Sequence, residues 1–333
     1  MKLIVTIDTE GDNQWDHGAP LTTRNVAFWQ PFMDLCVRHS VRPTYLVTTE
    51  IIEDRAARDL LRRWSQEQLA EVGAHLHPWT TPPFVDEPGL RSNDSAHAFP
   101  SDLPEDLLRA KLATLTEQIQ AGVGLRPTSY RAGRFGFGAR CARVLTELGY
   151  VVDSSVTPLV NWRDTAGLPG GPGGPDFRSL PAKPFLIADV GGQGLLELPV
   201  TVVRTCPWVR RSPWATGLYQ ARAFRLARRL RHGGRQLPEP MWLRPFPGVR
   251  ADDLVRLWRT ACAHGVTTLV MMFHSSELMP AGSPYRPTRR SITALLALLD
   301  EFFTYVASSG GTFATLTEAA HAELASDPPV RRL

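Results

Sequence analysis

The chain has 333 residues, of which 43% are hydrophobic and 21% are charged. This composition is typical of a globular protein that buries a full core, and it excludes disorder along the whole chain. No apolar run approaches the roughly 20 residues of a membrane-spanning helix, and the N-terminal segment turns acidic too early for a secretory signal, which predicts a cytoplasmic protein.

Short apolar runs along the chain predict eight strands. The first run is continuously apolar, as a strand covered on both faces requires. The predicted strands lie at 3–7, 44–49, 72–77, 128–132, 150–155, 195–200, 268–273 and 312–316.

Amphipathic segments between these runs predict helices. The clearest is 105–121, with leucines and an isoleucine on one face and Gly122 as its expected C-terminal stop. The others lie at 24–39, 54–63, 138–148, 251–264 and 289–308. Repeated strand and helix alternation predicts an α/β protein with a parallel sheet or barrel, in which catalytic residues gather at the carboxyl ends of the strands.

Two long excursions interrupt the alternation. We predict one catalytic domain over 1–320 with insertions at about 156–194 and 202–250, followed by a frayed C-terminal tail at 321–333. The segment 165–176 is rich in Gly and Pro and predicts a lid or a surface loop.

The cysteines are spread singly, without a CxxC pair, so we interpret Cys36, Cys141, Cys206 and Cys262 as reduced and structural.

Three carboxylates follow the first predicted strand. Asp8, Glu10 and Asp12 are spaced by two residues, so an extended backbone would send them to the same side. Such close carboxylates repel one another unless protons or a cation are bound, and a divalent metal would supply that charge. A solvated acidic turn is the alternative.

Two histidines end another predicted strand. His75 and His77 are two residues apart, which directs both imidazoles to one face. Together with a strand-end carboxylate, they favour one metal ion with an open position for water and substrate.

These motifs resemble the polysaccharide deacetylases of the NodB-homology type, also called carbohydrate esterase family four, and most closely their WalW-like intracellular branch. The resemblance implies a distorted (β/α)7-type barrel with the two insertions. It implies that Asp8 is the catalytic base, that Glu10 is a metal ligand, and that His75 and His77 are the other ligands. Either Asp8 or Glu10 could be the carboxylate ligand, and Asp12 stays open as well, because DTE and HLH depart from the usual family motifs.

Three further motifs extend the resemblance to the strand at 268–273. Arg131 in SYRAGRFG would orient the base or the substrate, and Asp153 in VDSS would help to position the catalytic pair. His274 in MMFHSSEL would be the general acid, with Glu277 as its support. Simple salt bridging is the alternative for Arg131 and Asp153.

Aromatic residues flank these motifs and suit the apolar faces of sugar rings. We interpret Trp15, Trp79 and Phe135 as substrate contacts, with core packing as the alternative. Glu197 ends a predicted strand near the same face, where a surface role is equally consistent with the sequence.

The motifs together predict a metal-dependent hydrolase that removes an acyl group, with acetyl as the first choice, from an amino sugar. Zinc suits the ligands, as do cobalt, nickel and manganese. The alternatives are a deformylase or a hydrolase of a non-sugar amide with the same site, and a catalytically silent relative that binds glycans.

The positive charge of the chain is local. The net charge is +4, yet the segment from Arg204 to Arg235 holds nine arginines and no acidic residue. Residues 217–231 predict a basic amphipathic helix that contacts a membrane surface or the phosphates of a lipid-linked or nucleotide-linked sugar. A solvated basic face is the alternative. Nucleic-acid binding is not expected, because no reading motif is present.

Overall fold

A curled sheet of ten strands forms the centre of the computed structural model, which describes residues 1–12, 14–16, 20–85, 99–167, 173–188, 194–205 and 240–333. The strand order is β10-β1-β2-β3-β4-β5-β7-β6-β12, and β11 pairs with β1. The strands are β1 (Lys2–Thr9), β2 (Thr44–Val47), β3 (Glu71–Leu76), β4 (Ser129–Ala132), β5 (Val152–Asp153), β6 (Phe185–Ile187), β7 (Leu195–Glu197), β10 (Thr268–His274), β11 (Thr312–Ala314) and β12 (Val330–Arg331).

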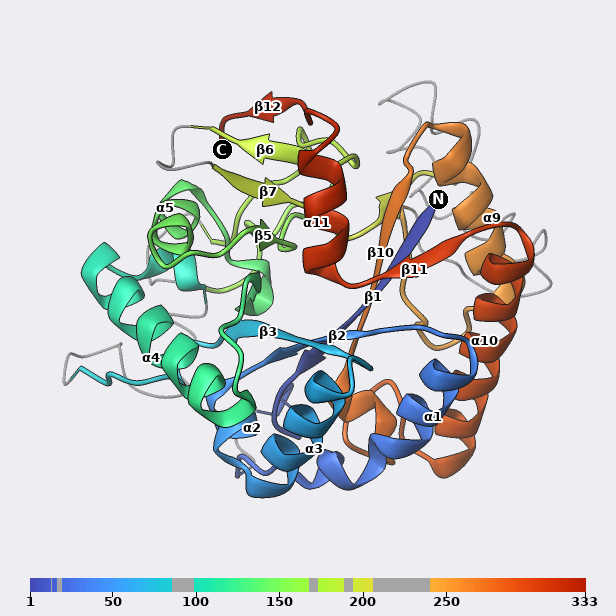
Figure 1. Ribbon diagram of the computed structural model, residues 1–333, viewed down its shortest axis with the longest axis horizontal. Helices are drawn as coiled ribbons and strands as arrows, with labels where there is room; N and C mark the ends of the chain where they lie inside the picture. Colours follow the sequence, from blue (N-terminus) through green and yellow to red (C-terminus); the bar gives the residue numbers. More distant parts are fainter. Residues whose placement is uncertain (13, 17–19, 86–98, 168–172, 189–193, 206–239) are drawn as a thin grey trace.

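The strands from β10 through β1 to β7 are all parallel, and only β6 runs antiparallel to its neighbour β7. Helices surround this sheet on its outer side (Figure 1). They are α1 (Gln30–Arg38), α2 (Thr49–Glu53), α3 (Arg55–Gln66), α4 (Glu105–Val123), α5 (Ala139–Glu147), α9 (Ala251–Ala263) and α10 (Arg289–Ser308). The helix α11 (Leu316–Leu324) lies inside this ring, between β5 and β10 (Figure 1).

Strand alternation divides the apolar residues into two cores. On β1, Leu3, Val5 and Ile7 belong to the large core under the outer helices. Ile4 belongs instead to a smaller core that includes the apolar side of α11. Because side chains alternate along a strand, residues in phase with Ile4 point to the inside of the half-barrel, and these include Asp8.

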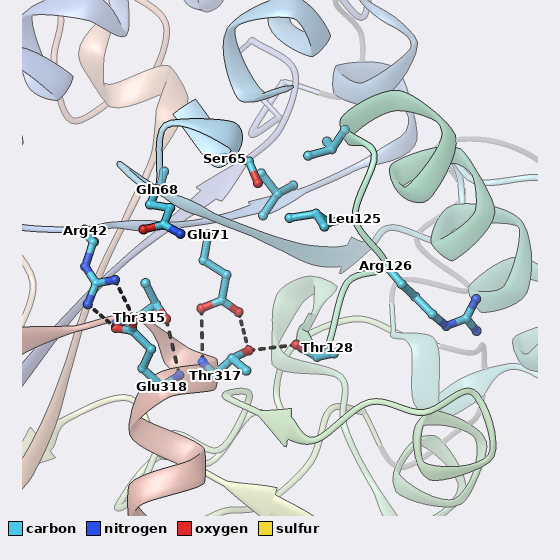
Figure 2. A pocket seen from close by; sticks show the side chains of 13 residues that line it. Arg42, Ser65, Gln68, Glu71, Leu125, Arg126, Thr128, Thr315, Thr317 and Glu318 are labelled. Atoms are coloured by element: carbon cyan, nitrogen blue, oxygen red, sulfur yellow. Dashed lines mark hydrogen bonds and ion pairs between the residues drawn. The ribbon is translucent and has the colours of Figure 1, made fainter. Parts of the chain in front are cut away.

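The amino ends of the strands are closed by a polar network around a cavity of about 370 Å³ (Figure 2). Glu71 accepts hydrogen bonds from the backbone nitrogen of Thr317 (3.1 Å), from its hydroxyl (2.6 Å) and from the hydroxyl of Thr44 (3.1 Å). Arg42 pairs with Glu318 in the first turn of α11, with an Nη2 to Oε2 distance of 2.6 Å. This end of the half-barrel is therefore a capped end, which leaves the carboxyl ends of the strands for chemistry.

The predicted α/β class and the distorted barrel are confirmed, and each of the eight predicted strands is present. The sequence missed β6, β12 and the two-stranded sheet of β8 (Val202–Val203) and β9 (Met241–Trp242). These strands have two or three residues, too few to show a period of two. The predicted tail at 321–333 instead contains the end of α11 and β12, which pairs with β6.

Two helix predictions differ in detail. The predicted helix 24–39 is divided into a 3-10 turn, Arg24–Phe28, and α1, because Pro31 starts a new helix in its first turn. The helix predicted at 105–121 continues through Gly122 and ends at Gly124, which takes the left-handed conformation with φ of 94°. Gly124 is therefore the C-terminal cap.

Helix α10 is the one described helix whose length and apolar composition would suffice to cross a membrane. Its buried side chains, which include Leu295, Leu299 and Phe302, belong to the large core. Cys36, Cys141 and Cys262 are free thiols, and Cys206 lies outside the described residues.

Candidate active site

Two pairs of adjacent strands, β10 with β1 and β3 with β4, place polar residues at one end of the half-barrel. Asp8 on β1 pairs in register with His274 on β10, and His75 on β3 pairs with Arg131 on β4. These positions are in phase with the inner core, so their side chains meet inside the half-barrel. Sheet register thus assembles residues that lie far apart in the sequence.

Glu10, His75 and His77 form a compact, buried group with ligand atoms within 4.8 Å of one another. Glu10 Oε2 lies 3.2 Å from His77 Nε2 and 3.8 Å from His75 Nε2. Two imidazoles and one carboxylate are a donor set that divalent transition metals bind, with one position left open. The three residues that the sequence proposed as ligands are therefore brought together.

The surroundings of the two imidazoles suit metal binding. His75 Nδ1 lies 2.9 Å from the carbonyl oxygen of Arg131, to which it donates, so Nε2 is the free nitrogen that faces Glu10. A Cβ atom on Gly133 would lie 2.4 Å from His77 Cδ2, so only glycine leaves room for this ring. Burial lowers the pKa of both histidines, which keeps the imidazoles neutral, as ligands must be.

Glu10 forms no ion pair with an arginine or lysine among the described residues, and the positive charge of Arg244 only partly compensates its burial. Burial, and then the negative charges of Asp8 and Glu50, raise the pKa of Glu10 well above its ordinary value. A buried carboxyl group beside two neutral imidazoles is stabilised by a positive ion. The donor set and its electrostatics thus fit a divalent metal.

Asp8 has a different environment, because it is paired with Arg131. Arg131 Nη1 lies 2.6 Å from Asp8 Oδ1 and 2.9 Å from the hydroxyl of Thr6. The same guanidinium donates to the carbonyl and the hydroxyl of Ser154. Burial alone would raise the pKa of Asp8, but Arg131, with His75 and His274, lowers that pKa to about 2. Asp8 is therefore ionised and fixed in orientation.

His274 is held by a pair of charged side chains. Arg244 Nη2 lies 2.9 Å from His274 Nδ1 and 2.8 Å from Glu277 Oε1. Nδ1 also lies 3.3 Å from Glu277 Oε1, so it accepts from Arg244 in the neutral ring and donates to Glu277 in the protonated ring, and both forms carry a proton on Nε2. That nitrogen faces the ligand group, 3.8 Å from Glu10 Oε1. Glu277 was expected from the sequence as a support for His274, whereas Arg244 was not.

The ligand group, Asp8 and His274 line a cavity of about 240 Å³. Its apolar walls include Trp15, Trp79 and Phe135, the aromatic residues that the sequence proposed as substrate contacts. Trp15 packs edge-on against His274, with ring centroids 5.0 Å apart, and Trp79 packs against His77 at 4.5 Å. The cavity also includes Gln14 and Arg134, which the sequence analysis did not single out.

Asp12 is committed elsewhere, so the structure does not support it as an alternative ligand. Its Oδ1 accepts from the backbone and side-chain nitrogens of Asn25, at 2.9 and 2.6 Å. Its Oδ2 accepts from Thr22 and from the backbone of Arg24. Both oxygens thus fix the turn that begins at Arg24.

Asp153 and Glu197 are not brought to the cavity. In register, Asp153 pairs with Tyr130 and with Glu197, and Tyr130 belongs to the outer core. This row is one residue out of phase with Arg131, so it faces the outer helices. Asp153 accepts from Ser155, and Glu197 accepts from the backbone of Val156. Asp153 is therefore not placed to position Asp8 and His274, which contact Arg131, Glu277 and Arg244 instead, and Glu197 does not line the cavity.

Burial and the neighbouring Asp153 raise the pKa of Glu197 well above its ordinary value, and burial raises the pKa of Asp153 as well. The sequence could not separate the two faces, since both sides of β5 and β7 are buried. The arginine-rich helix predicted at 217–231 lies outside the described residues.

No known protein family matches the chain by sequence, and no curated protein matches it either. Among solved structures, a protein from Mycobacterium smegmatis that is named as a candidate polysaccharide deacetylase matches over 100% of this chain and 94% of its own, with 17% identity and a TM-score of 0.55. The chain has the fold of the polysaccharide deacetylases. The resemblance seen in the motifs is thus confirmed for the fold.

Two other matches have lower TM-scores. A family 4 acetyl xylan esterase from Clostridium thermocellum, in complex with a cobalt ion, matches over 96% of this chain and 89% of its own at 13% identity, with a TM-score of 0.42. A mutant of BA3943, named as a CE4 family pseudoenzyme with restored activity, matches over 96% and 67% at 11% identity, also with a TM-score of 0.42. The WalW-like branch stays a prediction.

Proposed function

We propose that this protein is a metal-dependent amide hydrolase that removes an acyl group, with acetyl as the first choice, from an amino sugar. The observation that carries the proposal is the group of Glu10, His75 and His77 at the base of a cavity that also presents Asp8 and His274. A ligand group, an ionised carboxylate and a histidine proton donor are the parts that such a reaction requires.

A divalent ion held by the three ligands would lower the pKa of a water molecule toward about 7 and polarise the acyl carbonyl. Asp8 is the group that accepts the proton of this water. Its pKa of about 2 keeps it ionised at neutral pH, and Arg131 fixes its orientation. Asp8 therefore needs no rearrangement before the water attacks.

His274 supplies the second proton. An amine anion is too poor a leaving group to depart unaided, so the nitrogen must be protonated as the bond to the acyl carbon breaks. The donor is the protonated imidazolium form of His274, which gives up the proton on Nε2, the nitrogen that faces the ligand group, and returns to the neutral ring. On the other side of the ring, Nδ1 contacts Glu277 Oε1 at 3.3 Å and Arg244 Nη2 at 2.9 Å. Trp15, Trp79 and Phe135 would hold the sugar ring against the cavity wall.

Metal content measured by mass spectrometry tests the ligand group. We expect close to one equivalent of a divalent ion in the wild-type protein and almost none in a His75→Ala/His77→Ala variant after the same dialysis. A His264→Ala/His321→Ala variant is the matched control, because it removes two histidines that are exposed or partly exposed outside the cavity. Zinc is offered first, followed by cobalt, nickel and manganese.

The wild-type protein and its variants are then assayed on N-acetyl and N-formyl amino sugars and on a non-sugar amide. Release of acetate from the sugar supports the proposal, whereas release of formate or cleavage of the non-sugar amide alone identifies the deformylase or amidase alternative. A protein that binds metal and sugar without turnover would be the catalytically silent relative. Absence of bound metal in the wild type, even after incubation with zinc, would contradict the proposal.

Two expectations from the sequence remain proposals. The first is a cytoplasmic location, and the second is a contact of the segment 217–231 with a membrane or with substrate phosphates.

A further inference from the structure

Arg134 is a cavity residue whose charge has no partner in the described part of the chain. It lines the same cavity as the metal-ligand group and lies close enough to His77 to influence the pKa of that ring. No hydrogen bond or ion pair from its side chain is formed with the described residues. Its guanidinium carbon lies over the ring of Phe99, 5.4 Å from the ring centroid.

The backbone at Arg134 is strained. Arg134 has φ of 53° and the next residue, Phe135, has φ of 58°, both in the left-handed region that residues with a side chain rarely adopt. The turn is closed by a hydrogen bond from the nitrogen of Gly136 to the carbonyl of Gly133, at 3.0 Å. Strain held in this way is typical of functional sites.

The carboxylates around the cavity are already used. Asp8 pairs with Arg131, and Glu277 pairs with Arg244. Glu10 faces the imidazoles and belongs to the metal-ligand group. Burial lowers the pKa of Arg134, which means that its charge has lost part of its hydration, yet a guanidinium stays charged. With a divalent ion in place, positive charge would exceed negative charge in the cavity.

We propose that Arg134 binds an anionic substituent of the substrate, so that the preferred acylated amino sugar carries a phosphate or a carboxylate close to its amide. This inference rests on the proposed function, since it concerns the substrate of the same site. A guanidinium presents paired donors that match phosphate and carboxylate oxygens. Phe135 stacks on Trp162, with centroids 5.3 Å apart, and so helps to fix the turn that carries Arg134.

Calorimetry on the metal-loaded protein tests the inference with sugars that lack an amide and cannot be turned over. The probes are methyl glucoside, glucose 1-phosphate and the methyl glycoside of glucuronic acid, with inorganic phosphate alone as a further titration. We expect at least one anionic sugar to bind about 10-fold more tightly than the neutral one or better. The stronger of the two shows whether phosphate or carboxylate is the source of the charge.

Variants of Arg134 assign this preference to one side chain. Arg134→Gln should lose it, and Arg134→Lys should keep part of it. Arg63→Gln, which removes an exposed arginine on α3, should leave it unchanged. Equal binding of neutral and anionic sugars to the wild type would overturn the inference. So would a preference that survives in Arg134→Gln, because the metal ion alone would then attract the anion.

The proposed function and this inference fail in different ways. Binding of anionic sugars through Arg134 without turnover of any amide would contradict the hydrolase and leave the inference standing. Turnover with equal kcat losses on neutral and anionic N-acetyl sugars in Arg134→Gln would place Arg134 at the reacting carbonyl and overturn the inference. A rise in KM confined to the anionic substrate is the expected result.

Discussion

The amino and carboxyl ends of the half-barrel both carry charged side chains, but these charges are paired differently at the two ends. At the amino end, Thr317 donates two hydrogen bonds to Glu71 and Arg42 pairs with Glu318 (Figure 2). The hydroxyl of Thr44 donates a third hydrogen bond to Glu71, so each charge has a partner that belongs to the fold. At the carboxyl end, neither Glu10 nor Arg134 forms an ion pair with an oppositely charged arginine, lysine or carboxylate among the described residues, although His77 lies beside Glu10.

We interpret the paired charges at the amino end as stabilising the fold, and the charges of Glu10 and Arg134 as contacts for a ligand. A buried charge without a partner costs several kcal/mol, so a folded protein retains it where a ligand completes the site. The cavity at the amino end is larger, but it is therefore the weaker candidate for a functional site. We propose that the smaller cavity takes a cation at Glu10 and an anion at Arg134, and the predictions below test that contrast.

The largest expected effect is on catalysis at Asp8. Asp8→Asn keeps the size of the side chain but removes the proton acceptor, so we expect kcat to fall by about 10²–10⁴-fold. Metal content should stay near the wild-type value, because Asp8 pairs with Arg131 and lies outside the ligand group. Activity and metal content are measured on the same preparation. An Asp8→Asn protein with undiminished kcat would contradict the role of Asp8 as the base.

The next effect is on stability, at Arg131. Arg131→Met leaves Asp8 buried and unpaired, and we expect the free energy of unfolding to fall by about 3–5 kcal/mol. Urea denaturation of the metal-free protein measures this. A loss below 1 kcal/mol would show that the pair of Arg131 and Asp8 contributes no more to stability than the exposed pair of Arg42 and Glu318 at the amino end.

The pH dependence of the stability of Arg131→Met tests whether the loss comes from the charge of Asp8. The pKa of Asp8 is lowered from 3.8 to about 2 in the folded protein, so its stabilising effect is present above pH 4 and is lost as the pH falls through about 2. This window corresponds to about 2 kcal/mol. Without Arg131, burial would raise the pKa of Asp8 instead. The stability difference between wild type and variant should therefore shrink on acidification.

The sequence predicted the features that depend on the direction of the chain and on the alternation of side chains along a strand. The alternation of β1 and β3 was sufficient to place Glu10, His75 and His77 on one side of two strands. It failed at Asp153 and Glu197, because β5 and β7 are short and buried on both faces, so nothing in the sequence indicates which side chain points inward. The sequence did not indicate Arg244 and Arg134 for another reason. The position of Arg244 depends on strand register and that of Arg134 depends on a turn, and neither feature produces a periodic pattern in the sequence.

A moderate effect is expected at Glu277, which holds His274 from behind. The Glu277 carboxylate is buried, which would raise its pKa, but Arg244 and His274 lower that pKa to about 2. Glu277→Gln removes this charge, and we expect kcat to fall by about 10–100-fold with little change in KM. Glu277→Asp should recover part of the loss. A change in KM alone would contradict a positioning role, and loss of Arg244 by Arg244→Met should reproduce the effect on kcat.

The smallest effect is expected at the amino end. Arg42 and Glu318 form an ion pair whose side chains are 42% and 41% exposed, so water screens their attraction. Arg42→Met should change the free energy of unfolding by about 0–1 kcal/mol and leave kcat and metal content unchanged, because Arg42 lies at the opposite end of the strands from the ligand group. It removes the same charge as Arg131→Met, so the two variants compare one substitution at both ends. If Arg42→Met abolished activity or cost as much as Arg131→Met, charge pairing would not distinguish the two ends, and the cavity of Figure 2 would be the better candidate for a functional site.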